Sequence, residues 1–326
     1  MTPPHLAEPV MQRLAREALW LINKGLEPVD ALFSHDDGTT AGPPLFIVGA
    51  PRSGTSLTYQ LVTQQLKAGY LISAMNYLFG APNLLLEIMK PFLGRPKPVF
   101  ESAYGRTPGV LAPAENGNFW FRWFPRDGEQ GHYVDPIGLR TESYAGMKRA
   151  VDSMARILGR PMVFKSVYLS LATAALAQIF PQGRFLFVRR DAFFICQSLL
   201  LARLNRPNPA AWWSVKIPGY RWLLSEPVWR QVTDQVFHTD RILERDLGRY
   251  AVGRYLELRY EDLCVDPRAN IRKICQWLRP AGFVPYEDML LPEAFSPSNE
   301  IRVSRDVTVQ IEGRLRELSG EPMRDA

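Results

Sequence analysis

The chain has 326 residues, of which 46% are hydrophobic and 22% are charged, and its formal net charge at pH 7 is +6. This length and apolar content suffice to bury the core of a large α/β domain, which excludes a disordered chain. The excess positive charge favours an anionic ligand. It is dispersed along the sequence, and no basic block is dense enough to indicate a nucleic-acid partner.

Residues 1–42 are expected to form an N-terminal helical segment, with an amphipathic helix over residues 6–24 and Arg13, Arg16 and Glu17 on its wet side. This segment lacks the charged start and long apolar run of a signal peptide, and no membrane span is visible. Three cysteines without C-x-x-C spacing indicate a reducing compartment, with neither a disulfide framework nor a metal site. We therefore expect a cytoplasmic protein.

A strand predicted over Leu45–Val48 is followed by a glycine-bounded loop and by a helix predicted over residues 55–66. Strand, loop and helix in this order are the context of a phosphate-binding loop. Gly49 and Gly54 allow the backbone to wrap around an anion, and the loop amides and the helix N-terminus then bind it. The sequence therefore predicts a site for an anionic phosphate compound.

The lysine that follows the second glycine in nucleoside-triphosphate loops is missing, and Thr55 stands in its place. Arg52, inside the loop, supplies a cation from a different point, and its planar guanidinium suits several oxygens at once. This change disfavours ATP with magnesium and favours a phosphate ester handled without metal. A structural loop and a degenerate nucleotide-binding loop remain open at this point.

A turn-rich region, residues 75–160, follows and is expected to be a substrate-binding insertion. It contains several prolines, the aromatic group "NFWFRWF" and a helix predicted over residues 141–158. Long insertions in compact domains are more often functional than idle.

Beyond the insertion, apolar runs and helical patterns alternate. Strands are predicted within residues 161–166, 183–190 and 254–263, and helices over residues 169–180, 192–204 and 271–278. This alternation predicts an α/β fold with a P-loop-like, doubly wound and mostly parallel sheet. We expect this domain to span residues 43–300 and to be followed by a C-terminal segment, residues 301–326.

Four cations directly follow or end predicted strands, namely Arg52, Lys165, Arg189 and Arg190. Ligands of doubly wound sheets bind at the carboxyl ends of the strands. We therefore expect the fold to gather these four charges along one edge of the sheet, where they would bind a polyanion together with the phosphate loop.

Three separated motifs, "GAPRSGTSL", "FPQGRFLFVRRDAFFICQSL" and "LRYEDLCVDP", carry a resemblance to one family. Together they resemble the sulfotransferases that use 3'-phosphoadenosine-5'-phosphosulfate (PAPS), in particular a bacterial and tyrosylprotein-like branch. The resemblance implies a donor site formed by Arg52, Ser53, Gly54, Thr55, Ser56, Arg190, Ser198 and Tyr260.

In this family the first motif binds the 5'-phosphosulfate, and the arginine and serine of the second motif bind the 3'-phosphate. Lys165 is similar to a lysine that helps to hold the transferring group. PAPS has no γ-phosphate and its reaction requires no metal, which accounts for Thr55 in the lysine position. Arg52 and Lys165 would stabilise the charge that grows on the bridging oxygen and the sulfuryl group.

A hydroxyl acceptor requires a general base, and the candidates are Glu115 and His132. Glu115 lies beside the aromatic group of the insertion, and several branches of the family use a histidine. The tyrosylprotein enzymes have their glutamate nearer the phosphate loop, where this chain has "GYLISAMNYLF" without an acid. Near the C-terminus, "SPSNEIRVSRD" resembles a segment that closes over PAPS, with Ser298 or Ser304 as contacts.

The expected activity is transfer of a sulfuryl group from PAPS to a hydroxyl of a small-molecule, lipid or sugar acceptor. A metal-dependent nucleotide or metabolite kinase and a non-catalytic nucleotide-binding module are the competing interpretations. The identity of the acceptor, the choice of base and the existence of a homodimer are left open.

Overall fold

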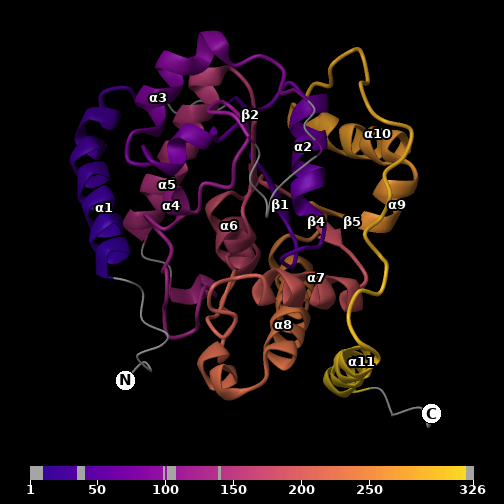
Figure 1. The fold of residues 1–326 in the computed structure, drawn as a ribbon. Coiled ribbons are helices and arrows are strands. Elements are labelled where there is room, and N and C mark those ends of the chain that lie inside the picture. Colours follow the sequence, from indigo (N-terminus) through magenta and orange to yellow (C-terminus); the bar gives the residue numbers. More distant parts are fainter. Residues whose placement is uncertain (1–9, 35–40, 98–99, 101–107, 139–140, 321–326) are drawn as a thin grey trace.

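The computed structural model describes residues 10–34, 41–97, 100, 108–138 and 141–320 (Figure 1). At its centre is a five-stranded sheet with the strand order β2-β3-β1-β4-β5, in which each strand runs parallel to its neighbours. The strands are β1 (Leu45–Val48), β2 (Gly69–Tyr70), β3 (Met162–Lys165), β4 (Arg184–Arg189) and β5 (Tyr255–Arg259). The predicted α/β fold with a mostly parallel sheet is confirmed.

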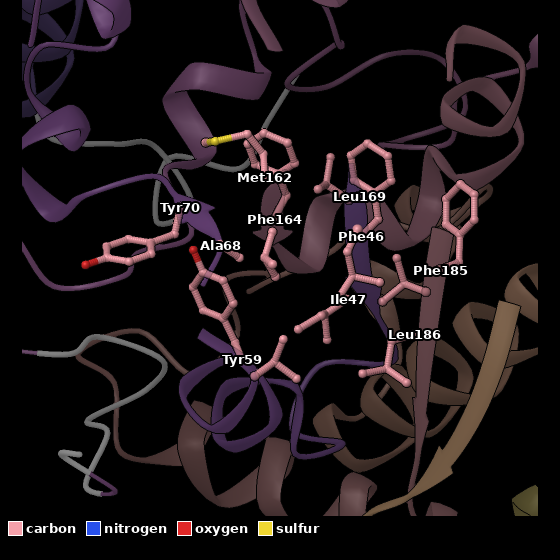
Figure 2. Packing of buried hydrophobic residues seen from close by; sticks show 14 of the residues in the cluster. Phe46, Ile47, Tyr59, Ala68, Tyr70, Met162, Phe164, Leu169, Phe185 and Leu186 are labelled. Carbon is pink, nitrogen blue, oxygen red and sulfur yellow. The ribbon is translucent and has the colours of Figure 1, made fainter. Parts of the chain in front are cut away.

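The core around the central strand is aromatic. Phe46 of β1 lies in register with Phe164 of β3 and Phe185 of β4, and its ring stacks on both, with centroids 5.7 and 5.4 Å apart. Figure 2 shows these rings beside one another among the buried side chains of the sheet. All four residues of β1 are inaccessible to solvent. Because β1 is covered on both faces, its sequence is a continuous apolar run without alternation.

Helices surround the sheet (Figure 1). They are α1 (Val10–Ala31), α2 (Thr55–Gln65), α3 (Pro82–Met89), α4 (Gly117–Trp120), α5 (Thr141–Leu158), α6 (Thr173–Ile179), α7 (Ala192–Leu204), α8 (Val228–Tyr250), α9 (Tyr260–Val265), α10 (Pro267–Leu278) and α11 (Arg305–Ser319). Among them, α2 packs against β1 and β3 and directly follows the predicted phosphate loop.

Several elements differ from the predictions. The strand predicted within residues 254–263 ends at Arg259, because the chain turns into α9 at Tyr260. The helix predicted over residues 169–180 is a 3-10 turn, Val167–Leu171, followed by α6. β2 was not predicted, since two residues carry no periodicity.

The N-terminal helix extends further than expected, to Ala31, and residues 6–9 lie outside the described part of the chain. Asn23 of α1 donates to the carbonyl of Tyr77 at 2.9 Å and accepts from the amide of Gly80 at 2.6 Å. Asp30 accepts from Asn83 and from the amide of Leu84, both at 2.9 Å. α1 is therefore attached to the predicted insertion along its whole C-terminal half.

The C-terminal helix α11 packs against α8 and α7. Its Arg314 donates Nη2 and Nε to the two carboxylate oxygens of Asp234 in α8, at 2.7 and 3.0 Å. The Asp234 side chain is only 4% exposed. A bidentate pair of this kind fixes both the position and the orientation of α11.

Arg314→Ala is expected to lower the free energy of unfolding by about 3 to 5 kcal/mol, because Asp234 would remain buried without its cation. Arg316→Ala on the same helix is the matched control. It removes an exposed pair with Glu312 and should cost about 0 to 1 kcal/mol. Chemical denaturation measures both variants, and equal small losses would show that the Arg314 pair does not hold α11.

Candidate active site

The loop between β1 and α2 has a strained backbone that only certain residues tolerate. Arg52 and Gly54 both lie in the left-handed region, with φ of 74° and 98°. A Cβ on Gly54 would lie 2.4 Å from the Tyr260 ring. Strain at a non-glycine residue such as Arg52 is typical of functional sites, where the surrounding structure maintains it.

A serine that was not among the predicted site residues holds the start of this loop by two hydrogen bonds. Ser170, in the 3-10 turn after β3, accepts from the Gly49 amide at 3.1 Å and donates to the Gly49 carbonyl at 2.8 Å. Within the described residues, the buried hydroxyl of Ser53 has no hydrogen-bond partner. An unpaired buried donor inside a glycine loop fits a site for an anion.

Arg190 follows β4 and lies over the Tyr260 ring, with its guanidinium carbon 4.7 Å from the ring centroid. It donates to the Arg52 carbonyl at 3.0 Å, to the Asn299 side chain at 2.9 and 3.1 Å, and to the Ser298 carbonyl. Ser198, in the second turn of α7, accepts from Arg52 Nε at 3.0 Å. The loop, the end of β4 and residues 298–299 therefore meet at one point.

The contact between Arg190 and residues 298–299 was only partly foreseen. Ser298 was a predicted contact of the site, whereas Ser304 caps the N-terminus of α11 by accepting from the Val307 amide. Asn299 was not predicted, although it also donates to Glu261 at 3.1 Å. The only signal for Asn299 in the sequence was its polar side chain next to Ser298. Its partner Arg190 lies 109 positions away in the chain, so the sequence does not show the contact.

A second group lies at the end of β3. Lys165 forms an ion pair with Glu115 and donates to Ser56 Oγ at 2.9 Å. The lysine side chain is 3% exposed and the glutamate side chain 25%, so the carboxylate is the more accessible partner. This pair joins the predicted insertion to the first turn of α2.

Both groups line one cavity with a volume of about 1350 Å³. It brings together nearly all of the predicted site residues, namely Arg52, Gly54, Thr55, Ser56, Glu115, Lys165, Arg190, Ser198 and Tyr260. Ser53 is fully buried behind the lining. The remaining wall includes apolar and aromatic side chains, among them Leu19, Tyr77, Leu78, Val110, Tyr168 and Trp213.

Arg189 does not join this cavity, so the prediction that four cations gather at one edge is wrong for this residue. Its guanidinium pairs with Glu244 at 2.6 Å and with Glu257 at 2.9 Å. Adjacent residues at the end of a strand point to opposite faces of the sheet. Arg189 and Arg190 therefore separate, and only Arg190 faces the loop.

His132 does not line the cavity either. Its Nδ1 accepts from the Lys216 amide at 2.9 Å, and its Nε2 lies 2.8 Å from the Arg126 carbonyl. Nε2 must therefore carry the proton, and both ring nitrogens are engaged with backbone groups. The structure thus brings Glu115, and not His132, to the other site residues.

Within the described residues, no group of three or more His, Cys, Asp or Glu side chains could hold a metal ion. In the same part of the chain, no helix combines the length and apolarity needed to cross a membrane.

Comparison with known proteins gives consistent matches. Residues 43–281 match the family model described as "Sulfotransferase family". Two curated relatives, both named omega-hydroxy-beta-dihydromenaquinone-9 sulfotransferase Stf3, come from Mycobacterium bovis and Mycobacterium tuberculosis. Each is 25% identical to this chain over an alignment of 269 positions, and the alignment covers 76% of this chain and 65% of the relative. The chain therefore spans slightly less than two thirds of their length.

Two solved structures match this chain, and the first of them supports the same fold. Sulfotransferase STF1 from Mycobacterium tuberculosis H37Rv has a TM-score of 0.51 and 11% identity, covering 92% of this chain and 81% of its own. Sulfotransferase STF9 from Mycobacterium avium has a TM-score of 0.49 and 17% identity, covering 88% and 70%.

The histidine that lies outside the cavity should affect stability. Burial lowers the pKa of His132 from 6.5 to about 4, so the unfolded chain binds this proton more tightly than the folded chain. The resulting stabilisation is complete above pH 6.5 and is lost as the pH falls toward 4, by about 3 kcal/mol.

The free energy of unfolding should therefore decrease less between pH 7 and pH 4 in His132→Gln than in the unchanged chain. Denaturant titrations at several pH values measure this difference. The same dependence on pH in both proteins would contradict a neutral, buried ring.

Proposed function

This chain belongs to the sulfotransferase family, and on that premise we propose that it transfers a sulfuryl group from PAPS to a hydroxyl of a lipid or other small-molecule acceptor. The observation that carries the proposal is the single cavity shared by the phosphate loop, by Arg190 with Ser198, and by the Lys165–Glu115 pair. A donor with two separate phosphate groups and one transferable group requires these three elements side by side.

The donor end of the cavity fits a nucleotide with phosphates at both the 5' and 3' positions. The glycine loop, with the unpaired Ser53 hydroxyl behind it, suits the 5'-phosphosulfate. Arg190 and Ser198 would hold the 3'-phosphate, since the guanidinium already gathers oxygens from several directions. The Tyr260 ring lies beside both Gly54 and Arg190, so it would pack between the two phosphate-binding parts of the site.

Thr55 in the place of the triphosphate-loop lysine argues against a kinase. Its side chain lies in the first turn of α2 and lines the cavity, while the cations come from Arg52 in the loop and Lys165 at the end of β3. These two cations would offset the negative charge at the 5' end of a bound donor without a magnesium ion.

Glu115 is the proposed general base. Its carboxylate would accept the proton of the acceptor hydroxyl, and the hydroxyl oxygen would then form a bond to sulfur as the bond from sulfur to the phosphate oxygen breaks. When bound, PAPS supplies the sulfuryl group. Lys165 lies between Glu115 and Ser56, so it can both orient the base and stabilise the negative charge that develops beside the loop.

The acceptor class is proposed from the remaining wall of the cavity. The apolar and aromatic side chains of this wall suit a ligand that presents one hydroxyl and a long apolar body. The Stf3 relatives are named for an ω-hydroxylated menaquinone, which has this form. A hydroxylated polyprenyl quinone is therefore the first acceptor class to test.

Adenosine 3',5'-bisphosphate should raise the melting temperature more than AMP does, and ATP with magnesium should have little effect. A ligand at one hundred times its dissociation constant adds about 2.7 kcal/mol, which raises the midpoint by about 2 to 4 °C in a large domain. Differential scanning fluorimetry measures all three ligands.

Arg190→Ala should remove most of the bisphosphate shift and leave the AMP shift nearly unchanged, because only the bisphosphate has the group that Arg190 binds. Arg189→Ala is the matched control, since this neighbour lies outside the cavity. A shift with ATP and magnesium alone would replace the sulfotransferase proposal with a kinase.

Glu115→Gln should lower kcat by about 100-fold to 10,000-fold, because it removes the group that accepts the proton. The bisphosphate-induced rise in melting temperature should remain, since Glu115 does not hold the donor phosphates. Glu129→Gln, an exposed position in the same insertion, is the matched control. Full activity of Glu115→Gln with a hydroxyl acceptor would exclude Glu115 as the base.

A further inference from the structure

One helix of the described chain exposes an apolar face that nothing in the structure covers. Met11, Leu14, Leu21, Ile22 and Val29 of α1 have exposed fractions of 76, 50, 67, 59 and 42%. At 100° per residue these side chains fall within one stripe along the helix. Scattered exposed apolar residues are ordinary on protein surfaces, but a stripe along about five turns of one helix indicates a binding surface.

The orientation of α1 is set by its other side. Asn23 and Asp30 are buried and bond to Tyr77, Gly80 and Leu84, which turns the apolar stripe away from the core. A rotation of α1 that buried the apolar stripe would break these hydrogen bonds and separate α1 from residues 77–84. The apolar stripe is thus a stable feature of the folded chain.

A polar stripe borders the apolar one on α1. At 100° per residue, the basic residues Arg13 and Lys24 fall beside the apolar stripe together with the acid Glu17, which lies 3.8 Å from Arg13, whereas Arg16 falls on the far side of the helix. This combination of an apolar face with a basic edge is typical of helices that lie in the interface of a bilayer. Anionic lipid headgroups complement the basic edge, whereas an isologous contact with a second copy would bring two such edges together.

α1 also reaches the mouth of the cavity. Leu19 of α1, together with Tyr77 and Leu78, lines the cavity, and Tyr77 and Leu78 are 69 and 41% exposed. Asn23 donates to the backbone carbonyl of Tyr77 at 2.9 Å, which attaches the helix to this part of the cavity wall. An apolar path therefore connects the outer face of α1 to the site.

We propose that α1 binds the surface of an anionic lipid bilayer, with its apolar stripe in the interface and its basic edge at the headgroups. A lipid acceptor then passes from the bilayer into the cavity past Leu19, Tyr77 and Leu78. The route of the acceptor rests on the proposed function, whereas binding of the bilayer depends on α1 alone.

Flotation of the full chain with vesicles tests the surface. The chain should float with vesicles that contain phosphatidylglycerol and phosphatidylcholine, and less with phosphatidylcholine alone or at high salt. Leu21→Glu should lower the partition coefficient by about tenfold, because it places a charge in the apolar stripe. Val309→Glu is the matched control, since Val309 is 61% exposed on α11 (Figure 1), away from α1, and should float as the unchanged chain does.

The results distinguish binding of a bilayer from binding of a second copy of the chain. No flotation of the unchanged chain, or equal flotation of Leu21→Glu and Val309→Glu, would overturn the proposal. A dimer that dissociates on Leu21→Glu, measured by light scattering, would also overturn it in favour of a second copy on this face. The melting-temperature shift with adenosine 3',5'-bisphosphate is measured on the same samples, so failure to bind vesicles is distinguished from failure of the donor site.

Discussion

Arg52, Lys165 and Arg190, three of the cations that line the cavity, create the constraint on which the rest of the site depends. Like charges in a partly closed space repel one another, and the charge of Arg52 is among the causes that lower the pKa of Arg190, after burial. The protein holds each cation with its own oxygen atoms, from the Ser198 hydroxyl, the Glu115 carboxylate and the backbone and side chain of residues 298–299. These contacts keep the cations in position before an anionic ligand arrives, which is the preorganisation that transfer of a charged group requires.

The parallel sheet explains why the cations meet. β1, β3 and β4 are neighbours, and parallel strands present their carboxyl ends at the same edge. Arg52 follows β1, Lys165 ends β3 and Arg190 follows β4. The same geometry turns Arg189 to the opposite face, where Glu244 and Glu257 hold it outside the cavity.

The predicted insertion and the N-terminal helix supply further lining of the cavity. Glu115 of the predicted insertion pairs with Lys165, and α1 contributes Leu19 to the cavity and an exposed apolar stripe to the surface. A basic donor end and an apolar entrance within one cavity correspond to the two substrates of the proposed reaction, a nucleotide with several negative charges and a lipid with one reactive hydroxyl.

The sequence by itself determined the α/β fold, the glycine loop after β1 and the positions of Arg52, Lys165 and Arg190 at strand ends, because buried parallel strands are continuous apolar runs and glycine loops act locally. It could not determine that β2 exists, that His132 lies outside the cavity or that Asn299 holds Arg190. Only the tertiary structure decided these points and the pairing of Glu115 with Lys165. The pairs Glu115–Lys165 and Arg190–Asn299 join residues 50 and 109 positions apart, so they depend on how distant segments pack and leave no periodic signal in the chain.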